Sequence, residues 1–139
     1  PIHPIFDRRH WPMINGLSVT RDGLILMSLR TTSGVIAVDR ASGRIVWHAG
    51  PDVVAQQHTP VEMDDGSILV FDNGNLRAGS SNPFSRALEF DPATMQVVTR
   101  AGAAAGSGAL RYTDAGIWTS AHDNQTLSWW SEPAAAAEE

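Results

Sequence analysis

The chain has 139 residues, a formal charge of −5 and no cysteine; 42% of its residues are hydrophobic and 18% are charged. This is the balance of one globular domain. The acidic net charge and the lack of a basic run exclude nucleic acid and anionic membranes as partners. Without cysteine there is no disulfide, thiolate nucleophile or cysteine zinc site, so chemistry must come from histidine, arginine, carboxylates and hydroxyls.

No targeting segment is predicted. The first ten residues, "PIHPIFDRRH", lack the charged-then-apolar layout of a signal peptide, and no apolar run reaches the roughly 18 residues that span a bilayer. The first residue is Pro1 instead of methionine, so we expect a processed chain or a piece of a longer one.

Short apolar runs recur along the chain, and each has the length of a strand. Between them stand turn signals such as Asp22-Gly23, Ser33-Gly34 and Asp65-Gly66. Glycines in 101–109 make a helix there unfavourable. The pattern predicts an all-β fold with strands at 24–27, 35–38, 44–47, 67–71, 87–90 and 96–98.

The sequence also repeats. "RDGLILMSLR" (21–30) aligns with "DDGSILVFDN" (64–73) at an offset of 43 residues, and "VDRASGRIVW" (38–47) with "FDPATMQVVT" (90–99) at an offset of 52. Such repeats of short antiparallel strands are typical of β-propeller blades. A third, poorer copy spans 112–130. We therefore expect a partial propeller domain over 1–131, with two to three blades, and a disordered tail over 132–139.

Two consequences follow from this alignment. Fewer than about four blades cannot close a ring, so open blade edges would favour self-association. In "DRASG" the last residue, Gly43, is predicted to adopt positive φ, and the aligned residue is Met95, which would be strained there.

An ordered set of motifs resembles the bacterial arylsulfotransferase family over residues 11–99. The motifs are Trp11-x-x-x-Asn15, "SLRTTSGVIAVDRASGRIVWHAGP", "QQH", "LVFDNGN" and "SRALEFDPAT". The resemblance implies a six-bladed propeller in which a histidine takes a sulfuryl group from an aryl sulfate and passes it to a phenol. It also implies no cofactor, no metal, and a periplasmic or secreted location.

The resemblance also implies which residues form the site. The histidine of its "QH" motif falls on His58 and the arginine of its "S-x-R" segment on Arg30, as catalytic residues; Asn15 and Met13 are the expected substrate-binding residues. Where the family reads Trp-x-His-x-Asn, this chain has Met13 instead of histidine. A thioether carries no proton, so Met13 cannot serve as acid or base.

The chemistry suits these residue types. Sulfuryl transfer, like phosphoryl transfer, needs a positioned nucleophile and stabilised oxygen charge. Neutral imidazole, with a pKa near 6.5, can act as that nucleophile near pH 7, and a guanidinium offers fixed donors to sulfate oxygens. His58 and Arg30 fit these roles.

Structural interpretations stand beside the functional ones. His58 also fits a polar surface loop, Arg30 a solvated strand end, and Asp72-Asn73-Gly74 a turn in which Asn-Gly supplies positive φ. His3, His10, His48 and His122 are interpreted as surface residues, and Trp47, Trp118, Trp129 and Trp130 as seals between blades.

Three classes of function remain open. The first is a sulfotransferase, and the second is a non-catalytic propeller that binds or scaffolds. The third is a quinone-cofactor dehydrogenase, which would need acidic metal ligands and cofactor-stacking tryptophans. The "QQH" and "FDNGN" segments do not favour that third class.

Overall fold

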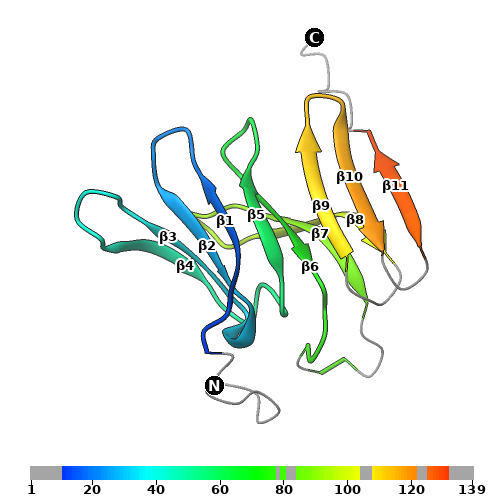
Figure 1. Ribbon diagram of the computed structural model, residues 1–139, viewed down its shortest axis with the longest axis horizontal. Coiled ribbons are helices and arrows are strands. Elements are labelled where there is room, and N and C mark those ends of the chain that lie inside the picture. Colours follow the sequence, from blue (N-terminus) through cyan, green and yellow to red (C-terminus); the bar gives the residue numbers. More distant parts are fainter. Residues whose placement is uncertain (1–10, 78, 81–83, 104–107, 122–124, 132–139) are drawn as a thin grey trace.

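The chain folds into three successive antiparallel sheets (Figure 1). This computed structural model describes residues 11–77, 79–80, 84–103, 108–121 and 125–131. The predicted all-β class is confirmed, because these residues contain strands, turns and one short 3-10 helix, η2 (Arg30–Thr32). In the same ranges no helix is long and apolar enough to cross a membrane.

Each sheet is a meander of consecutive strands. Sheet 1 contains β1 (Ile14–Val19), β2 (Ile25–Leu29), β3 (Gly34–Val38) and β4 (Ile45–Ala49). Sheet 2 contains β5 (His58–Glu62), β6 (Ile68–Asp72), β7 (Ser85–Phe90) and β8 (Val97–Ala103), and sheet 3 contains β9 (Gly108–Thr113), β10 (Gly116–Ala121) and β11 (Thr126–Trp130). The sequence repeat holds, since β2 and β6 begin 43 residues apart and β3 and β7 end 52 apart.

Five strands, β1, β5, β9, β10 and β11, have no counterpart among the predicted apolar runs, although the predicted third copy of the repeat (112–130) covers β10 and β11. β5 begins with His58, so the interpretation of His58 as a loop residue is wrong. The strand also contains Pro60, which has no N–H to give to a ladder. It is tolerated because β5 lies at the edge of its sheet, where that N–H is not needed for pairing.

The core lies between the sheets. Leu26 and Val35 of sheet 1 pack with Val70 and Leu88 of sheet 2, and Trp47 meets Phe90 edge-on at 5.9 Å between ring centroids. A second cluster joins the other face of sheet 2 to sheet 3 through Leu69, Phe71, Leu110 and Ile117. Sheet 2 is therefore covered on both faces, and every residue of β6 is buried.

The first strands of the sheets lie next to one another, β1 against β5 and β5 against β9 (Figure 1). The approach of β1 to β5 is close at Gly16, where an added Cβ would lie 2.6 Å from Thr59 N and 2.7 Å from Pro60 Cδ. This succession of sheets with adjacent first strands is propeller-like.

The paired hairpins match the predicted conformations. Gly43 has φ 68° and Met95 has φ 59°, so both are left-handed. Their N–H groups donate to Asp39 O at 2.9 Å and to Asp91 O at 2.8 Å, respectively. The two turns thus have the same geometry, with glycine in one and methionine in the other.

Candidate functional site

Four expected site residues lie at one end of neighbouring strands. Asn15 lies near the start of β1, Met13 just before it, Arg30 just after β2, and His58 begins β5. β1 pairs with β2 and lies against β5, so these positions share the lower end of the sheets in Figure 1. The Arg30 N–H donates to Met13 O at 3.0 Å. We call this the site end; the β1–β2 and β5–β6 hairpins lie at the opposite, hairpin end.

The His58 ring is held on two sides. It stacks on Phe71 of β6 with ring centroids 5.0 Å apart and planes at 19°, and its Nδ1 lies 2.8 Å from Thr59 Oγ1. When Nδ1 carries the proton and donates to Thr59, the lone pair of the neutral imidazole is on Nε2. The ring is half-buried, so His58 is a positioned group instead of a solvated loop side chain.

The segment before His58 is fixed by sheet 1. Gln57 O accepts hydrogen bonds from Asn15 Nδ2 and Ser28 Oγ, each at 3.0 Å. The Gln57 side chain donates through Nε2 to Ser28 Oγ at 2.9 Å and to Gly34 O at 2.7 Å. Asn15, expected to bind substrate, thus uses its amide nitrogen to position the strand that carries His58.

Sheet 2 fixes the same segment from its other side. Asp72 is fully buried, and its Oδ1 accepts the Ala55 N–H at 2.8 Å. Its Oδ2 lies 2.9 Å from both Arg77 Nη2 and Arg86 Nε. Asn73 Nδ2 donates to Gln56 O at 2.5 Å. Residues 72–74 therefore have a structural role, as predicted, but Asp72 ends β6 and the three residues are not a simple turn.

The positive φ expected of Asn-Gly belongs to Gly74 alone, at 69°. Gly74 also donates its N–H to Ala55 O at 3.0 Å. Residues 72–74 act as a clamp on residues 55–57, and we call them the Asp72 clamp. The sequence carried one signal for it, a carboxylate that ends an apolar run and is followed by two arginines.

Cationic groups predominate at the site end. Two guanidiniums neutralise the single charge of Asp72, and burial lowers the pKa of Arg77, a shift that Asp72 opposes and Arg86 reinforces. No ion pair or side-chain hydrogen bond joins Arg30 to the residues that the structure describes. Besides Asp72, the described loops at this end contribute Asp52 as an acidic residue. The described hairpins at the opposite end all carry an aspartate: Asp22, Asp39, Asp65, Asp91 and Asp114.

Backbone strain and unpartnered acceptors gather at the same end. Met13, Gln56 and Thr59 have φ of 52°, 52° and 55°, and a β-branched residue rarely adopts that conformation. Such strain concentrates at functional sites. Three buried amide oxygens have no hydrogen-bond partner: Asn15 Oδ1, Gln57 Oε1 and Asn73 Oδ1. An unpartnered buried acceptor costs stability, so these three oxygens add to the local strain.

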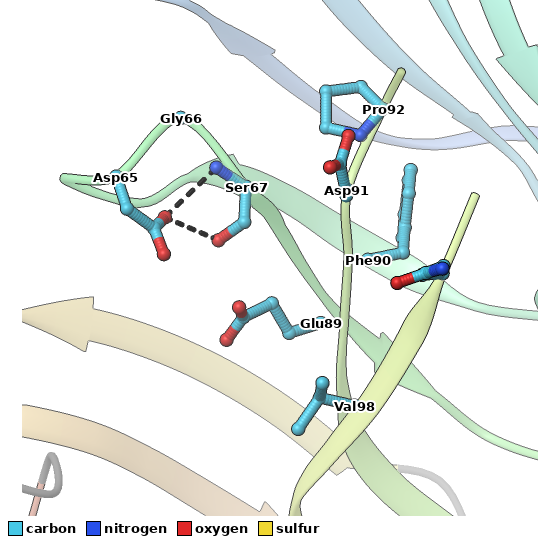
Figure 2. A pocket seen from close by; sticks show the side chains of 9 residues that line it. Asp65, Gly66, Ser67, Glu89, Phe90, Asp91, Pro92 and Val98 are labelled. Atoms are coloured by element: carbon cyan, nitrogen blue, oxygen red, sulfur yellow. Dashed lines mark hydrogen bonds between the residues drawn. The ribbon is translucent and has the colours of Figure 1, made fainter. Parts of the chain in front are cut away.

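A pocket at the hairpin end has the opposite character (Figure 2). It is lined by Asp65, Ser67, Glu89 and Asp91, among others. The Asp65 carboxylate accepts from Ser67 N at 3.0 Å and Ser67 Oγ at 2.6 Å, and Asp91 accepts from Ala93 N at 2.7 Å. These carboxylates stabilise turns and repel anions, so this pocket does not suit a sulfate ester.

Other candidate groups lie elsewhere. His48 is exposed on β4, whereas His3, His10 and His122 fall outside the described residues. In the described part of the chain, no three His, Cys, Asp or Glu side chains are arranged to hold a metal ion. No protein-family model matches the chain, and no curated protein matches its sequence.

Proposed function

We propose that the chain is an arylsulfotransferase-like protein that moves a sulfuryl group from an aryl sulfate to a phenol through His58. One observation carries this proposal: the His58 ring is stacked on Phe71 and bonded to Thr59 Oγ1 at the cationic end of the fold. A histidine held in this way loses little further rotamer freedom when it reacts.

Two displacements make up the reaction. In the first, the lone pair on His58 Nε2 attacks sulfur, the sulfur–aryl oxygen bond breaks, and its electron pair leaves on the phenolate. In the second, the oxygen of the acceptor phenol attacks the same sulfur, the N–S bond breaks, and its electron pair returns to Nε2. The acceptor's proton passes to water, because Met13 cannot take it.

The remaining side chains stabilise the charge on the sulfate oxygens and orient His58. Arg30 is a permanently charged donor for the sulfate oxygens, whose negative charge persists through the transfer. Thr59 Oγ1 orients the imidazole through its contact with Nδ1, and in the Nδ1–H tautomer that contact leaves the lone pair on Nε2. Asn15 and the Asp72 clamp position the backbone of residues 55–58. They are positioning residues.

A second candidate function is a non-catalytic module that binds aromatic anions. Met13 favours it, because Met13 is 39% exposed and stands where the family resemblance has a histidine. Arg30 would supply charge and a thioether packs well beside rings, so binding needs no acid or base.

The test is incubation with para-nitrophenyl sulfate, followed by intact-mass measurement and by absorbance of released nitrophenolate. We expect one added sulfuryl group and a burst of about one nitrophenolate per chain. His58→Ala should abolish both and leave the far-UV circular dichroism unchanged. His48→Ala, which removes an exposed imidazole from β4, is the matched control and should react like the parent.

Three results would refute the catalytic proposal. An adduct that survives His58→Ala removes His58 from the reaction. An adduct lost equally in His48→Ala points to non-specific modification. Saturable binding of the sulfate ester without any adduct, weakened by Arg30→Ala, would replace catalysis with the binding module.

A further inference from the structure

The outer face of sheet 1, turned away from sheet 2, is apolar and uncovered. Strand register places Leu17, Met27, Ile36 and the exposed His48 in one row and Val19, Ile25, Val38 and Ile45 in the next. Leu17 is 66% exposed, and Val19 and Ile45 are each 58% exposed. The opposite face, with Leu26, Val35 and Ala37, is fully buried against sheet 2. Such a face is too apolar for a surface that stays in water.

The outer face of sheet 3, at the other end of the stack (Figure 1), is also largely apolar, with Arg111 beside Trp118 and Ser120 beside Leu127 as its polar members. Leu127 is 70% exposed, Trp129 51% and Trp118 38%, and the two tryptophan rings lie 6.4 Å apart. Ala109, Leu127 and Trp118 line a shallow apolar hollow on this sheet. The opposite face buries Leu110 and Ile117 against sheet 2.

The two faces of sheet 2 show that apolar sheet faces in this fold contact neighbouring sheets. Both of its faces are apolar, and each is buried against a neighbouring sheet whose first strand lies beside β5. The outer faces of sheets 1 and 3 therefore have the composition of sheet-to-sheet contacts, and they lie at the two ends of one row of three sheets.

We propose that these faces bind each other in a second copy of the chain, so that two copies close a ring of six sheets. The outer face of sheet 1 packs on the outer face of sheet 3 of the other copy, and the reverse contact closes the ring. Closed propellers contain about four to eight sheets, so two copies of three fall within that range. A two-fold axis makes both contacts identical.

The area is sufficient. A strand of five or six residues is roughly 17–20 Å long and strands lie about 4.8 Å apart, so a face of three or four strands covers about 300 Å². Two contacts bury four such faces, about 1,200 Å² or more in total, which reaches the size of stable interfaces.

The ring also brings two candidate sites together. β1, β5 and β9 are the first strands of their sheets and lie side by side, so they would line the ring axis in both copies. Each copy then contributes one His58 and one Arg30 around a shared opening at the site end. The inference concerns the fold and holds whether or not His58 is sulfurylated.

Sedimentation velocity and light scattering of the 139-residue chain test the proposal, with a dimer as the expected species. Met27→Lys on β2 and Trp118→Glu on β10 each place a charge on one face, and both positions are on central strands, away from sheet edges. Each variant alone should be monomeric, because both contacts in its dimer would contain the introduced charge. Leu76→Lys, at an exposed apolar residue outside both faces, is the control and should dimerise.

Mixing the two variants in equal amounts should restore a dimer. One contact is then unaltered, and the other pairs the new lysine with the new glutamate. A monomeric parent chain, polymers larger than a dimer, or failure of the mixture to dimerise would overturn the proposal. If the copies associated instead through the open edge strands of their sheets, the single variants would still associate, and that result would also overturn the proposal. If circular dichroism shows that either variant is unfolded, Leu17→Lys and Leu127→Glu replace the pair.

Discussion

Sheets 1 and 2 are two versions of one four-stranded plan, and they differ most at the site end. In sheet 2, β6 ends at Asp72, which is fully buried between two arginines. At the 43-residue offset, the equivalent positions in sheet 1 are Leu29 for Asp72 and Arg30 for Asn73. Sheet 2 uses its polar groups to hold the fold, and sheet 1 presents a cation without an ion pair to the described residues.

The same offset relates Asn15 to His58 and Ser28 to Phe71. In sheet 2 the ring of His58 has an aromatic neighbour on which to stack, and in sheet 1 Asn15 has a small hydroxyl residue and bonds to Gln57 O instead. One backbone plan therefore carries the proposed nucleophile in one repeat and a residue that positions its strand in the other. Equivalent backbone positions in the two repeats thus carry side chains with different proposed roles, one structural and one chemical.

Removing the Asp72 clamp should produce the largest change in stability. Asp72→Ala leaves Arg77 and Arg86 without their shared carboxylate and the Ala55 N–H without an acceptor. Breaking a buried ion pair from one side costs about 3–5 kcal/mol. Urea unfolding measures it against Leu29→Ala at the equivalent position of sheet 1, where we expect a loss of about 1–2 kcal/mol for a half-buried side chain. Equal losses would contradict the division of roles.

Filling the gap between the first strands should have the next largest effect. Gly16→Ala places a Cβ 2.6 Å from the Thr59 backbone nitrogen, which cannot move without shifting β5. Overpacking of this kind costs about 1–3 kcal/mol. Gly34→Ala is the matched control, because its Cβ would meet Ala49 O at an ordinary 3.6 Å, and it should leave the unfolding midpoint nearly unchanged. A neutral Gly16→Ala would mean that β1 and β5 are not this close.

Restoring a proton-carrying group to sheet 1 should sharpen the chemical difference. If the proposed function is correct, Met13→His should raise aryl sulfate turnover by at least about tenfold. General acid–base catalysis typically contributes about 10²–10⁴-fold, so this expectation is set below that range. The left-handed φ of 52° at Met13 is one that histidine tolerates. A new limb near pH 6.5 in the rate profile should accompany the gain. Met13→Leu is the control; an equal gain there would show that proton transfer is not the reason.

The sequence predicted the parts of this comparison that depend on local pattern. The predicted apolar runs correspond to β2, β3, β4, β6, β7 and β8, and the repeat offsets match the strand positions. β1, β5 and β9 were missed because these edge strands mix polar with apolar residues, and β5 also contains Pro60, a pattern that is typical of loops. The Asp72 clamp was missed because Arg77 reaches Asp72 from a loop, and burial of a carboxylate depends on packing that no short window encodes.

Substitutions in the β3–β4 and β7–β8 hairpins should have the smallest effects. A Cβ at Gly43 meets nothing within 4 Å, so Gly43→Ala should cost about 1 kcal/mol from the left-handed backbone alone. At Met95 the same strain is already present, but the side chain packs partly on the core between sheets 1 and 2. Met95→Gly relieves about 1 kcal/mol of strain and loses about as much apolar contact, so it should stay close to the parent. Met95→Ala loses the contact and keeps the strain, so glycine should exceed alanine by about 1 kcal/mol at both positions. Urea unfolding of the parent and the three variants measures both differences, and an alanine at 95 as stable as glycine would show that the two hairpins do not share one conformation in solution.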